Sequence, residues 1–148
     1  MTIQEQLSAD MATSMKAGEA TRTGVLRLLR SAFKYEEIKV GHALDHAEGL
    51  KLLQREAKQR KDSIEAYRTA SREDLATVEE TELKIISSYL PEAMTTAELE
   101  ALVDGVISEL GATSPAQMGA VIGGVMKRAG ARADGGAVSK LVREKLAS

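Results

Sequence analysis

The chain has 148 residues, of which 43% are hydrophobic, only 3% are aromatic and none is cysteine. This length suits one domain or two small ones, and the lack of cysteine excludes disulfides and thiolate metal sites. Hydrophobic residues that include so few aromatics favour a core of packed helices over a β-sandwich. No apolar run is long enough to span a membrane and no basic start precedes an apolar segment, so we expect a soluble, cytoplasmic protein without membrane association.

The net charge of −2 conceals three blocks of opposite sign. Residues 22–72 contain twelve Lys and Arg against seven Asp and Glu, and residues 114–148 contain six basic residues against two acidic ones. Between them, residues 73–110 contain ten acidic residues and a single lysine. Such blocks indicate either an anionic partner for the basic faces or helix faces that neutralise one another.

Apolar residues recur at helical spacing along the whole chain, and no alternating pattern typical of a strand is present. The spacing predicts seven helices, over residues 2–17, 19–40, 45–69, 71–90, 96–110, 114–129 and 134–148. Ser71 is expected to cap the fourth helix, which should stop at Pro91, and Thr95 with Glu98 forms a capping-box pattern. The sequence therefore predicts an all-α protein. It consists of an N-terminal region of about four helices over residues 1–92 and a three-helix tail domain over residues 93–148.

The sixth predicted helix contains the glycines Gly119, Gly123 and Gly124. Each costs about 1 kcal/mol relative to alanine inside a helix, so a reason for their presence is expected. One explanation is close packing on another helix, which we assign to Gly119 and Gly123. The other is close approach of a ligand backbone.

Basic residues and glycines gather in the turn between the last two helices. Exposed N–H groups, glycines and cations together suit a phosphate, although the spacing matches neither a dinucleotide nor a P-loop fingerprint. The predicted phosphate contacts are Lys127, Arg128, Gly130, Arg132, Gly135, Gly136 and Lys140. A secondary basic face is predicted on the second and third helices, made of Arg27, Arg30, Lys34, Lys51, Arg55 and Lys58.

Residues suited to catalysis or metal binding are sparse. His42 and His46 stand four residues apart, but they straddle a predicted helix start and no further ligand cluster is visible. We therefore predict exposed histidines, no metal and no cofactor. The carboxylates lie on solvated helix faces, where their pKa values do not suit acid–base work, so no catalytic residue is predicted.

Six segments of the chain resemble the YqeY-like family, and they follow one another in the family's order over nearly the whole length. They are Val25–Leu29, Glu56–Ile64, Arg72–Leu75, Tyr89–Pro91, Met118–Gly123 and Gly130–Gly135. Ala120 stands where the family often has lysine, and Ile122 where it often has methionine. The C-terminal part of this family is similar to the tail of the B subunit of the tRNA-dependent Asp/Glu amidotransferase.

The resemblance implies an all-helical protein whose tail domain handles tRNA. In the amidotransferase the catalytic cradle lies outside the tail, and this chain has no room for it, so we do not expect an enzyme acting on its own. The leading hypothesis is a non-catalytic tRNA-binding or tRNA-handling accessory protein. One alternative is an adaptor whose acidic helices over residues 73–110 dock a synthetase or an amidotransferase subunit. Another is participation in glutamine-dependent carbon–nitrogen ligase activity, that of an amidotransferase.

Overall fold

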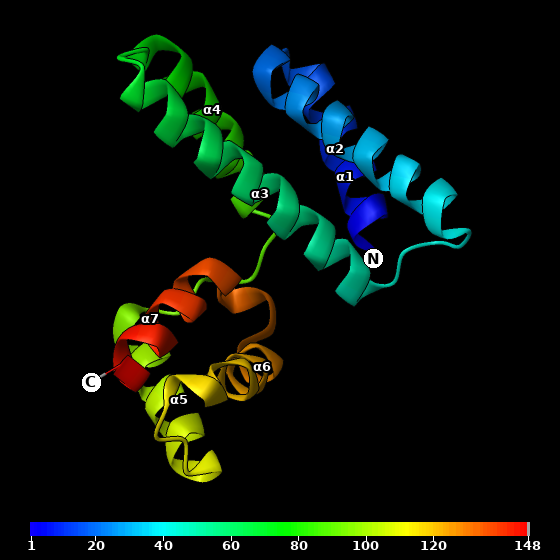
Figure 1. The fold of residues 1–148 in the computed structure, drawn as a ribbon. Helices are drawn as coiled ribbons and strands as arrows, with labels where there is room; N and C mark the ends of the chain where they lie inside the picture. The colour runs from blue at the N-terminus through cyan, green and yellow to red at the C-terminus, as the bar shows by residue number, and fades with distance from the viewer. Residues whose placement is uncertain (148) are drawn as a thin grey trace. The chain divides into compact units, whose positions relative to one another are not determined.

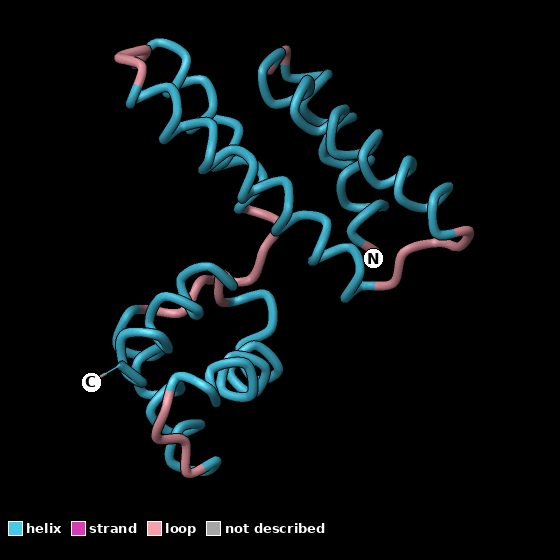
Figure 2. Tube along the Cα trace, viewed as in Figure 1, coloured by secondary structure: helices cyan, strands magenta, loops and turns pink. Residues whose placement is uncertain are grey.

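A computed structural model describes residues 1–147, and within them all regular structure is helical (Figures 1 and 2). The all-α prediction is confirmed. The α-helices are α1 (Ile3–Ala17), α2 (Ala20–Val40), α3 (His46–Thr69), α4 (Glu73–Ser87), α5 (Thr96–Leu110), α6 (Met118–Ala129) and α7 (Gly135–Ala147). Two 3₁₀ turns, η1 (Pro115–Gln117) and η2 (Gly130–Arg132), precede and follow α6. The chain divides into two compact units, Met1–Leu90 and a second unit that begins at Pro91.

The N-terminal unit is built from two helix pairs, α1 with α2 and α3 with α4 (Figure 1). Capping fixes where the helices start, since Thr2 with Glu5 and Asp45 with Glu48 form reciprocal capping boxes at α1 and α3. The hydrophobic core cluster is aliphatic apart from one phenylalanine, as the composition predicts. Its buried residues are Leu7, Val25, Leu26, Leu29, Phe33, Leu44, Leu52, Leu53, Ala57 and Ile86.

A hydrogen bond joins α1, the first helix of this unit, to the turn that follows α4, its last helix. The Tyr89 hydroxyl, in the turn after α4, donates to the Asp10 carboxylate on α1 at 2.5 Å. Partial burial and this bond to the carboxylate raise the pKa of Tyr89 above its usual value, so the phenol stays protonated at neutral pH. The bond therefore ties α1 to the segment that leaves α4.

The predicted N-cap of α4 is wrong. Ser71 has a φ of 58°, and its N–H donates to the Arg68 carbonyl while the Arg72 N–H donates to the Tyr67 carbonyl. These two bonds close the C-terminus of α3 in a Schellman motif, with Ser71 in the left-handed position. Ser71 therefore ends α3, and Arg72 precedes α4 without a capping side chain.

The left-handed backbone at Ser71 gives a stability prediction. Glycine adopts this conformation without the penalty that a Cβ brings, so Ser71→Gly is expected to stabilise the N-terminal unit by about 0.5–1 kcal/mol. Ser71→Ala keeps the Cβ and is expected to bring no gain. Thermal unfolding of the two variants measures the difference, and equal midpoints for glycine and alanine would contradict the assignment.

The fourth helix also differs from the prediction in its length and in one apolar position. It ends at Ser87, and Ser88 to Leu90 form a turn before Pro91. The helical spacing of Leu75, Val78 and Ile86 predicts that all three lie on the apolar face of this helix. Val78 is nevertheless exposed, whereas Glu79 points towards α3 and lies 3.9 Å from Arg60. The side of α4 that faces α3 is thus partly ionic.

Ion pairs between α3 and α4 explain much of the charge segregation in the N-terminal unit. Arg60 is hydrogen-bonded to Glu82 on α4 at 3.2 Å and to Glu56 on its own helix at 2.9 Å. Near the turn that joins α3 to α4, Arg68 pairs with Glu73 at 3.3 Å and with Glu80. Part of the basic block over residues 22–72 therefore neutralises the acidic block that follows it.

The C-terminal unit packs α5, α6 and α7 around a core of small aliphatic residues. Thr95 and Glu98 form the predicted capping box, and Gly111 ends α5 in the left-handed conformation. The helix expected from Ser114 starts as the 3₁₀ turn η1 before it continues as α6. The buried residues are Val103, Val106, Ala112, Val121, Val125, Ala129, Ala133, Val138, Val142 and Leu146.

The packing glycine of α6 is Gly124 and not the two that the sequence suggested. A Cβ on Gly124 would lie 2.9 Å from Cγ1 of Val106, so α5 and α6 approach closely there. A Cβ on Gly119 or Gly123 would meet nothing within 4 Å, and both glycines are exposed. The assignment of Gly119 and Gly123 to packing is therefore wrong, because α6 faces α5 with its other side.

Candidate nucleic-acid interface

The turn between α6 and α7 is held by Arg132. Gly130 has a φ of 56° and its N–H donates to the Met126 carbonyl, which ends α6. The Arg132 guanidinium then donates to the Glu92 carbonyl at 3.0 Å and to the Glu98 carboxylate at 3.1 Å. The Arg132 carbonyl in turn accepts from the Met94 N–H at 2.9 Å. Arg132, predicted as a phosphate contact, thus also fastens the segment before α5 to this turn.

Two further cations of the C-terminal helices pair with carboxylates on α5. Arg128 on α6 pairs with Glu109, and its hydrogen bond lowers the pKa of that carboxyl below its usual value. Lys145 on α7 lies 2.9 Å from Asp104. The acidic surface of α5 therefore neutralises part of the basic block that follows it. Sequence reasoning missed these partners, although the acidic residues of α5 were visible as a charge block.

Lys127 and Lys140 are the predicted phosphate contacts that keep an unpaired charge. Both are exposed, and neither forms an ion pair with a carboxylate within residues 1–147. They therefore remain available to an anion without first releasing a partner.

The N-terminus of α7 is capped from within the chain. Asp134 accepts a hydrogen bond from the Ala137 N–H at 3.2 Å, and its carboxylate lies where a Cβ on Gly136 would approach to 3.3 Å. Gly135 has open space around it. A phosphate approaching Gly135 and Gly136 would meet the negative charge of Asp134, so the lysines are better placed than this helix end to attract it.

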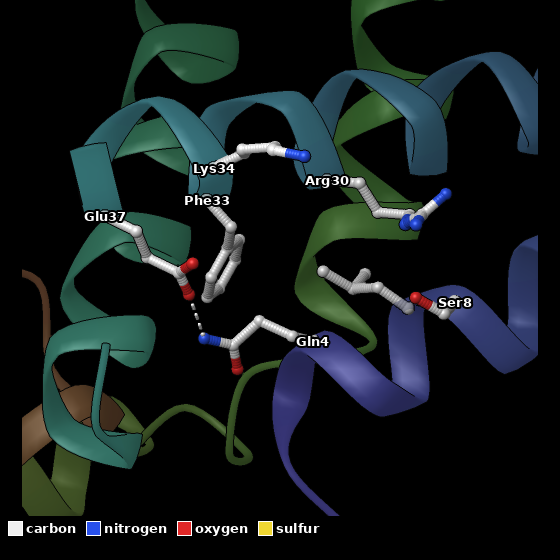
Figure 3. A pocket seen from close by; sticks show the side chains of 7 residues that line it. Gln4, Ser8, Arg30, Phe33, Lys34 and Glu37 are labelled. Carbon is white, nitrogen blue, oxygen red and sulfur yellow. Dashed lines mark hydrogen bonds between the residues drawn. The ribbon is translucent and has the colours of Figure 1, made fainter. Parts of the chain in front are cut away.

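The row Arg27, Arg30 and Lys34 lies exposed along α2. Arg30 and Lys34 border a groove of about 210 Å³ between α1 and α2, whose floor includes Leu7 and Phe33 (Figure 3). Arg30 contacts the Met11 sulfur at 3.7 Å. None of the three cations pairs with a carboxylate in the described part of the chain. This half of the secondary basic face is therefore a continuous positive strip.

From the α1 side of the groove, Gln4 donates at 2.9 Å to the carboxylate of Glu37, which lies on α2 with the two cations; this bond is the dashed line in Figure 3. The α2 wall of the groove thus carries one carboxylate besides its two cations, the α1 wall is polar, and the floor is apolar. Its polar groups are already hydrogen-bonded to one another in part, and we assign it no ligand of its own.

The α3 half of the secondary basic face is partly neutralised. Arg55 lies 3.4 Å from Glu36 on α2, and Lys58 lies 3.4 Å from Asp62 one turn further along α3. Lys51 is exposed and has no such partner among residues 1–147. The side chains of Arg55 and Lys58 are each more than half exposed, so their ion pairs are weak.

The histidines are placed as expected at the protein surface. His42 donates from Nδ1 to the Ala43 carbonyl at 2.9 Å, and its Nε2 lies 3.7 Å from Glu48. The contact with the Ala43 carbonyl, and secondly the charge of Glu48, raise the pKa of His42 above its usual value. Within residues 1–147, no three His, Cys, Asp or Glu side chains are arranged to hold a metal ion. The described helices also include none that is long and apolar enough to cross a bilayer.

The model of the family described as Yqey-like protein matches residues 4–146, almost the whole chain. The chain belongs to the YqeY-like family. This confirms the resemblance that the six sequence segments carry. The likeness of the family's C-terminal part to the amidotransferase tail stays a prediction.

Two curated proteins are similar to this YqeY-like chain. It is 35% identical over 112 residues to altered inheritance of mitochondria protein 41 of Lachancea thermotolerans, which covers 74% of this chain and 60% of that protein. It is 28% identical over 90 residues to a Schizosaccharomyces pombe protein described as uncharacterized, covering 61% of this chain and 73% of that protein. The match thus spans less than two thirds of the Lachancea relative, and neither name states a ligand.

Proposed function

We propose that this YqeY-like protein is a non-catalytic accessory protein that binds tRNA through phosphate contacts. The observation that carries the proposal is a set of exposed cations that no carboxylate within residues 1–147 neutralises. This set includes Lys127 and Lys140 in the C-terminal unit and the α2 row in the N-terminal unit, Arg27, Arg30 and Lys34. Because protein–nucleic acid affinity comes largely from such cations, these residues are the ones we expect to meet the phosphates.

Arg128 and Arg132 are also expected to contact phosphates, but unlike the lysines each is paired with a carboxylate. Their carboxylate partners Glu109 and Glu98 are exposed, so both ion pairs are weak. A phosphate, which offers several acceptor oxygens to a guanidinium, can replace such a partner. We expect these arginines to add to binding after the lysines have attracted the RNA.

The mode of recognition follows from the shortage of aromatic residues. With 3% aromatics, the chain has few rings on which to stack splayed bases. RNA is then recognised by its shape and its phosphates, with weak dependence on sequence and strong dependence on salt.

Charge reversal in the C-terminal unit tests the proposal. We expect Lys127→Glu combined with Lys140→Glu to weaken tRNA binding at least about tenfold at low salt, because two attractive interactions with phosphates become repulsive. The slope of log affinity against log salt should fall by about one for each phosphate that is no longer neutralised. Both are measured by fluorescence anisotropy with labelled tRNA over a series of salt concentrations.

The matched control is Lys16→Glu combined with Lys84→Glu. Both lysines are exposed and lie outside the two candidate faces, and the net charge changes by the same amount. This control should retain most of the affinity. If the two double variants lose affinity equally, binding follows net charge alone and the assignment of the surface is wrong. If the wild-type protein binds no tRNA at low salt, the proposed function itself is refuted.

A further inference from the structure

The outward face of α2 carries large apolar side chains that nothing in the structure covers. Leu28, Tyr35 and Ile38 have 56%, 70% and 75% of their surface exposed. By contrast, Val78 and Leu110 are single exposed apolar residues on α4 and α5. Contiguous exposed apolar surface of this kind is uncommon unless it mediates an interaction.

These side chains follow the spacing of a coiled-coil seam. Gly24, Leu28, Ser31, Tyr35 and Ile38 are separated alternately by four and three residues, so they form one stripe along the helix. The two small residues of the stripe leave space for a neighbour, since a Cβ on Gly24 would meet nothing within 4 Å. We call these five residues the α2 seam. It has the form of one half of a helix–helix contact, with three bulky side chains and two small residues along it.

Cations flank the α2 seam at the heptad positions e and g, whose charges determine which helices pair in a coiled coil. Arg27 and Lys34 occupy the same heptad position on one side, and Lys39 lies on the other side. All three are exposed, and none pairs with a carboxylate within residues 1–147. A helix laid on the seam would therefore be selected by negative charge at its own flanking positions.

The seam opens at its N-terminal end into a hollow of about 360 Å³. Met15, Gly18 and Arg27 are among the residues that line it, together with Gly24 of the seam itself. Met15 is also more than half exposed. Glu19 and Thr23 also line the hollow, so it extends the contact surface beyond Gly24 with mixed apolar and polar groups. It has room for one bulky side chain of a docked helix.

We propose that the α2 seam docks an acidic amphipathic helix of a partner protein. The partner helix carries apolar residues at three- and four-residue spacing and Glu or Asp beside them, facing Arg27, Lys34 and Lys39. This interaction goes beyond tRNA binding, because aliphatic side chains such as Leu28 and Ile38 gain nothing from phosphates. It resembles the groove-bound helices that other proteins recognise through anchors spaced by one helical turn.

A second copy of this chain is a poor occupant of the same face. Two α2 seams packed antiparallel would place Arg27 and Lys34 against the same residues of the other copy, and a parallel pair would set Lys34 against Lys39. Like charges at these positions oppose pairing. The acidic helices α4 and α5 of another copy offer only Val78 and Leu110 as exposed large apolar residues within their described lengths. The charges therefore favour a different protein.

The test uses the full chain and a defined probe, a fluorescein-labelled peptide of about three heptads. The peptide has Leu at both seam positions and Glu at the flanking positions, so its own charge keeps it from pairing with itself. A comparison peptide has Lys in place of every Glu. In RNA-free protein, anisotropy is expected to show binding of the Glu peptide at least about tenfold tighter than of the Lys peptide, and weaker binding as salt rises.

Two variants separate the apolar and ionic parts of the contact. Leu28→Ala, Tyr35→Ala and Ile38→Ala together are expected to weaken binding of the Glu peptide at least about tenfold, because the apolar anchors are removed. Arg27→Glu with Lys34→Glu is expected to invert the preference, so that the Lys peptide binds better. The control is Val78→Ala with Leu110→Ala, which removes exposed apolar surface elsewhere and should leave binding unchanged. All substituted residues are exposed, and circular dichroism verifies that the variants fold.

Several outcomes would overturn the docking proposal. Equal binding of the Glu peptide to the wild type and the triple alanine variant would do so. So would a wild-type dimer in sedimentation that the triple variant abolishes, since the seam would then be occupied by a second copy. If the triple variant instead loses tRNA and retains the peptide, the seam is an RNA surface. The Lys127 and Lys140 variant should keep peptide binding, which distinguishes failure here from failure of the proposed tRNA function.

Discussion

Replacing Gly124 by alanine is expected to destabilise the C-terminal unit by up to about 2 kcal/mol, although alanine is the better helix former. The new Cβ would lie 2.9 Å from Cγ1 of Val106, a side chain that is 2% exposed and cannot move away. Overpacking of a filled core typically costs about 1–3 kcal/mol, and the gain in helix propensity returns about 1 kcal/mol of it. The net effect is therefore a loss of stability.

Gly123 is the matched control, because it is the preceding residue on the same helix and meets nothing within 4 Å. Gly123→Ala is expected to stabilise the unit by about 0.5–1 kcal/mol through helix propensity alone. Hydrogen exchange at the amides of α5, α6 and α7 reports on this unit separately from the N-terminal one. A stabilising effect of both substitutions would mean that α5 and α6 do not approach each other as closely as described.

The caps and the breaks between helices were predictable because they depend on neighbours in sequence. Thr95 with Glu98 defines the start of α5 whatever surrounds it, and Gly111 defines its end. Ser71 shows the limit of such signals. A serine before an acidic helix is typical of an N-cap, and only the hydrogen bonds from Ser71 and Arg72 back into α3 reveal that it ends the preceding helix.

Which cations of the candidate site are paired with carboxylates was not predictable, because the pairing depends on contacts between residues distant in the sequence. Arg132 meets Glu98, 34 positions away, and Arg128 meets Glu109 only because α5 and α6 pack with these faces adjacent. The sequence predicted the basic cluster but not which cations stay unpaired. The same holds for the glycines of α6, since helical spacing cannot say which side of the helix α5 covers. The exposure of the α2 seam was not predictable for the same reason, because it depends on where α1, α3 and α4 pack.

Arg60 is expected to contribute more to the stability of the N-terminal unit than any other cation on α3 that pairs with α4. Its side chain is 14% exposed and hydrogen-bonds to Glu56 and Glu82, with Glu79 at 3.9 Å. Arg60→Met leaves these partly buried carboxylates facing one another without a cation, and we expect a loss of about 2–3 kcal/mol. Arg68→Met is the control, since Arg68 also pairs with α4 but is 47% exposed, and its removal should cost less than about 1 kcal/mol.

A double-mutant cycle shows whether Arg60→Met destabilises the protein because it leaves carboxylates without a cation. Glu79→Gln with Glu82→Gln, added to Arg60→Met, removes two of the three negative charges and should recover a substantial part of the stability. In the wild-type background the same two substitutions should be destabilising, because Arg60 then loses partners. Denaturant unfolding of the variants gives the coupling energy. Additive effects would show that Arg60 acts through the packing of its methylene groups against α4. The ion pairs of Arg60 would then contribute little to the stability of the α3–α4 helix pair.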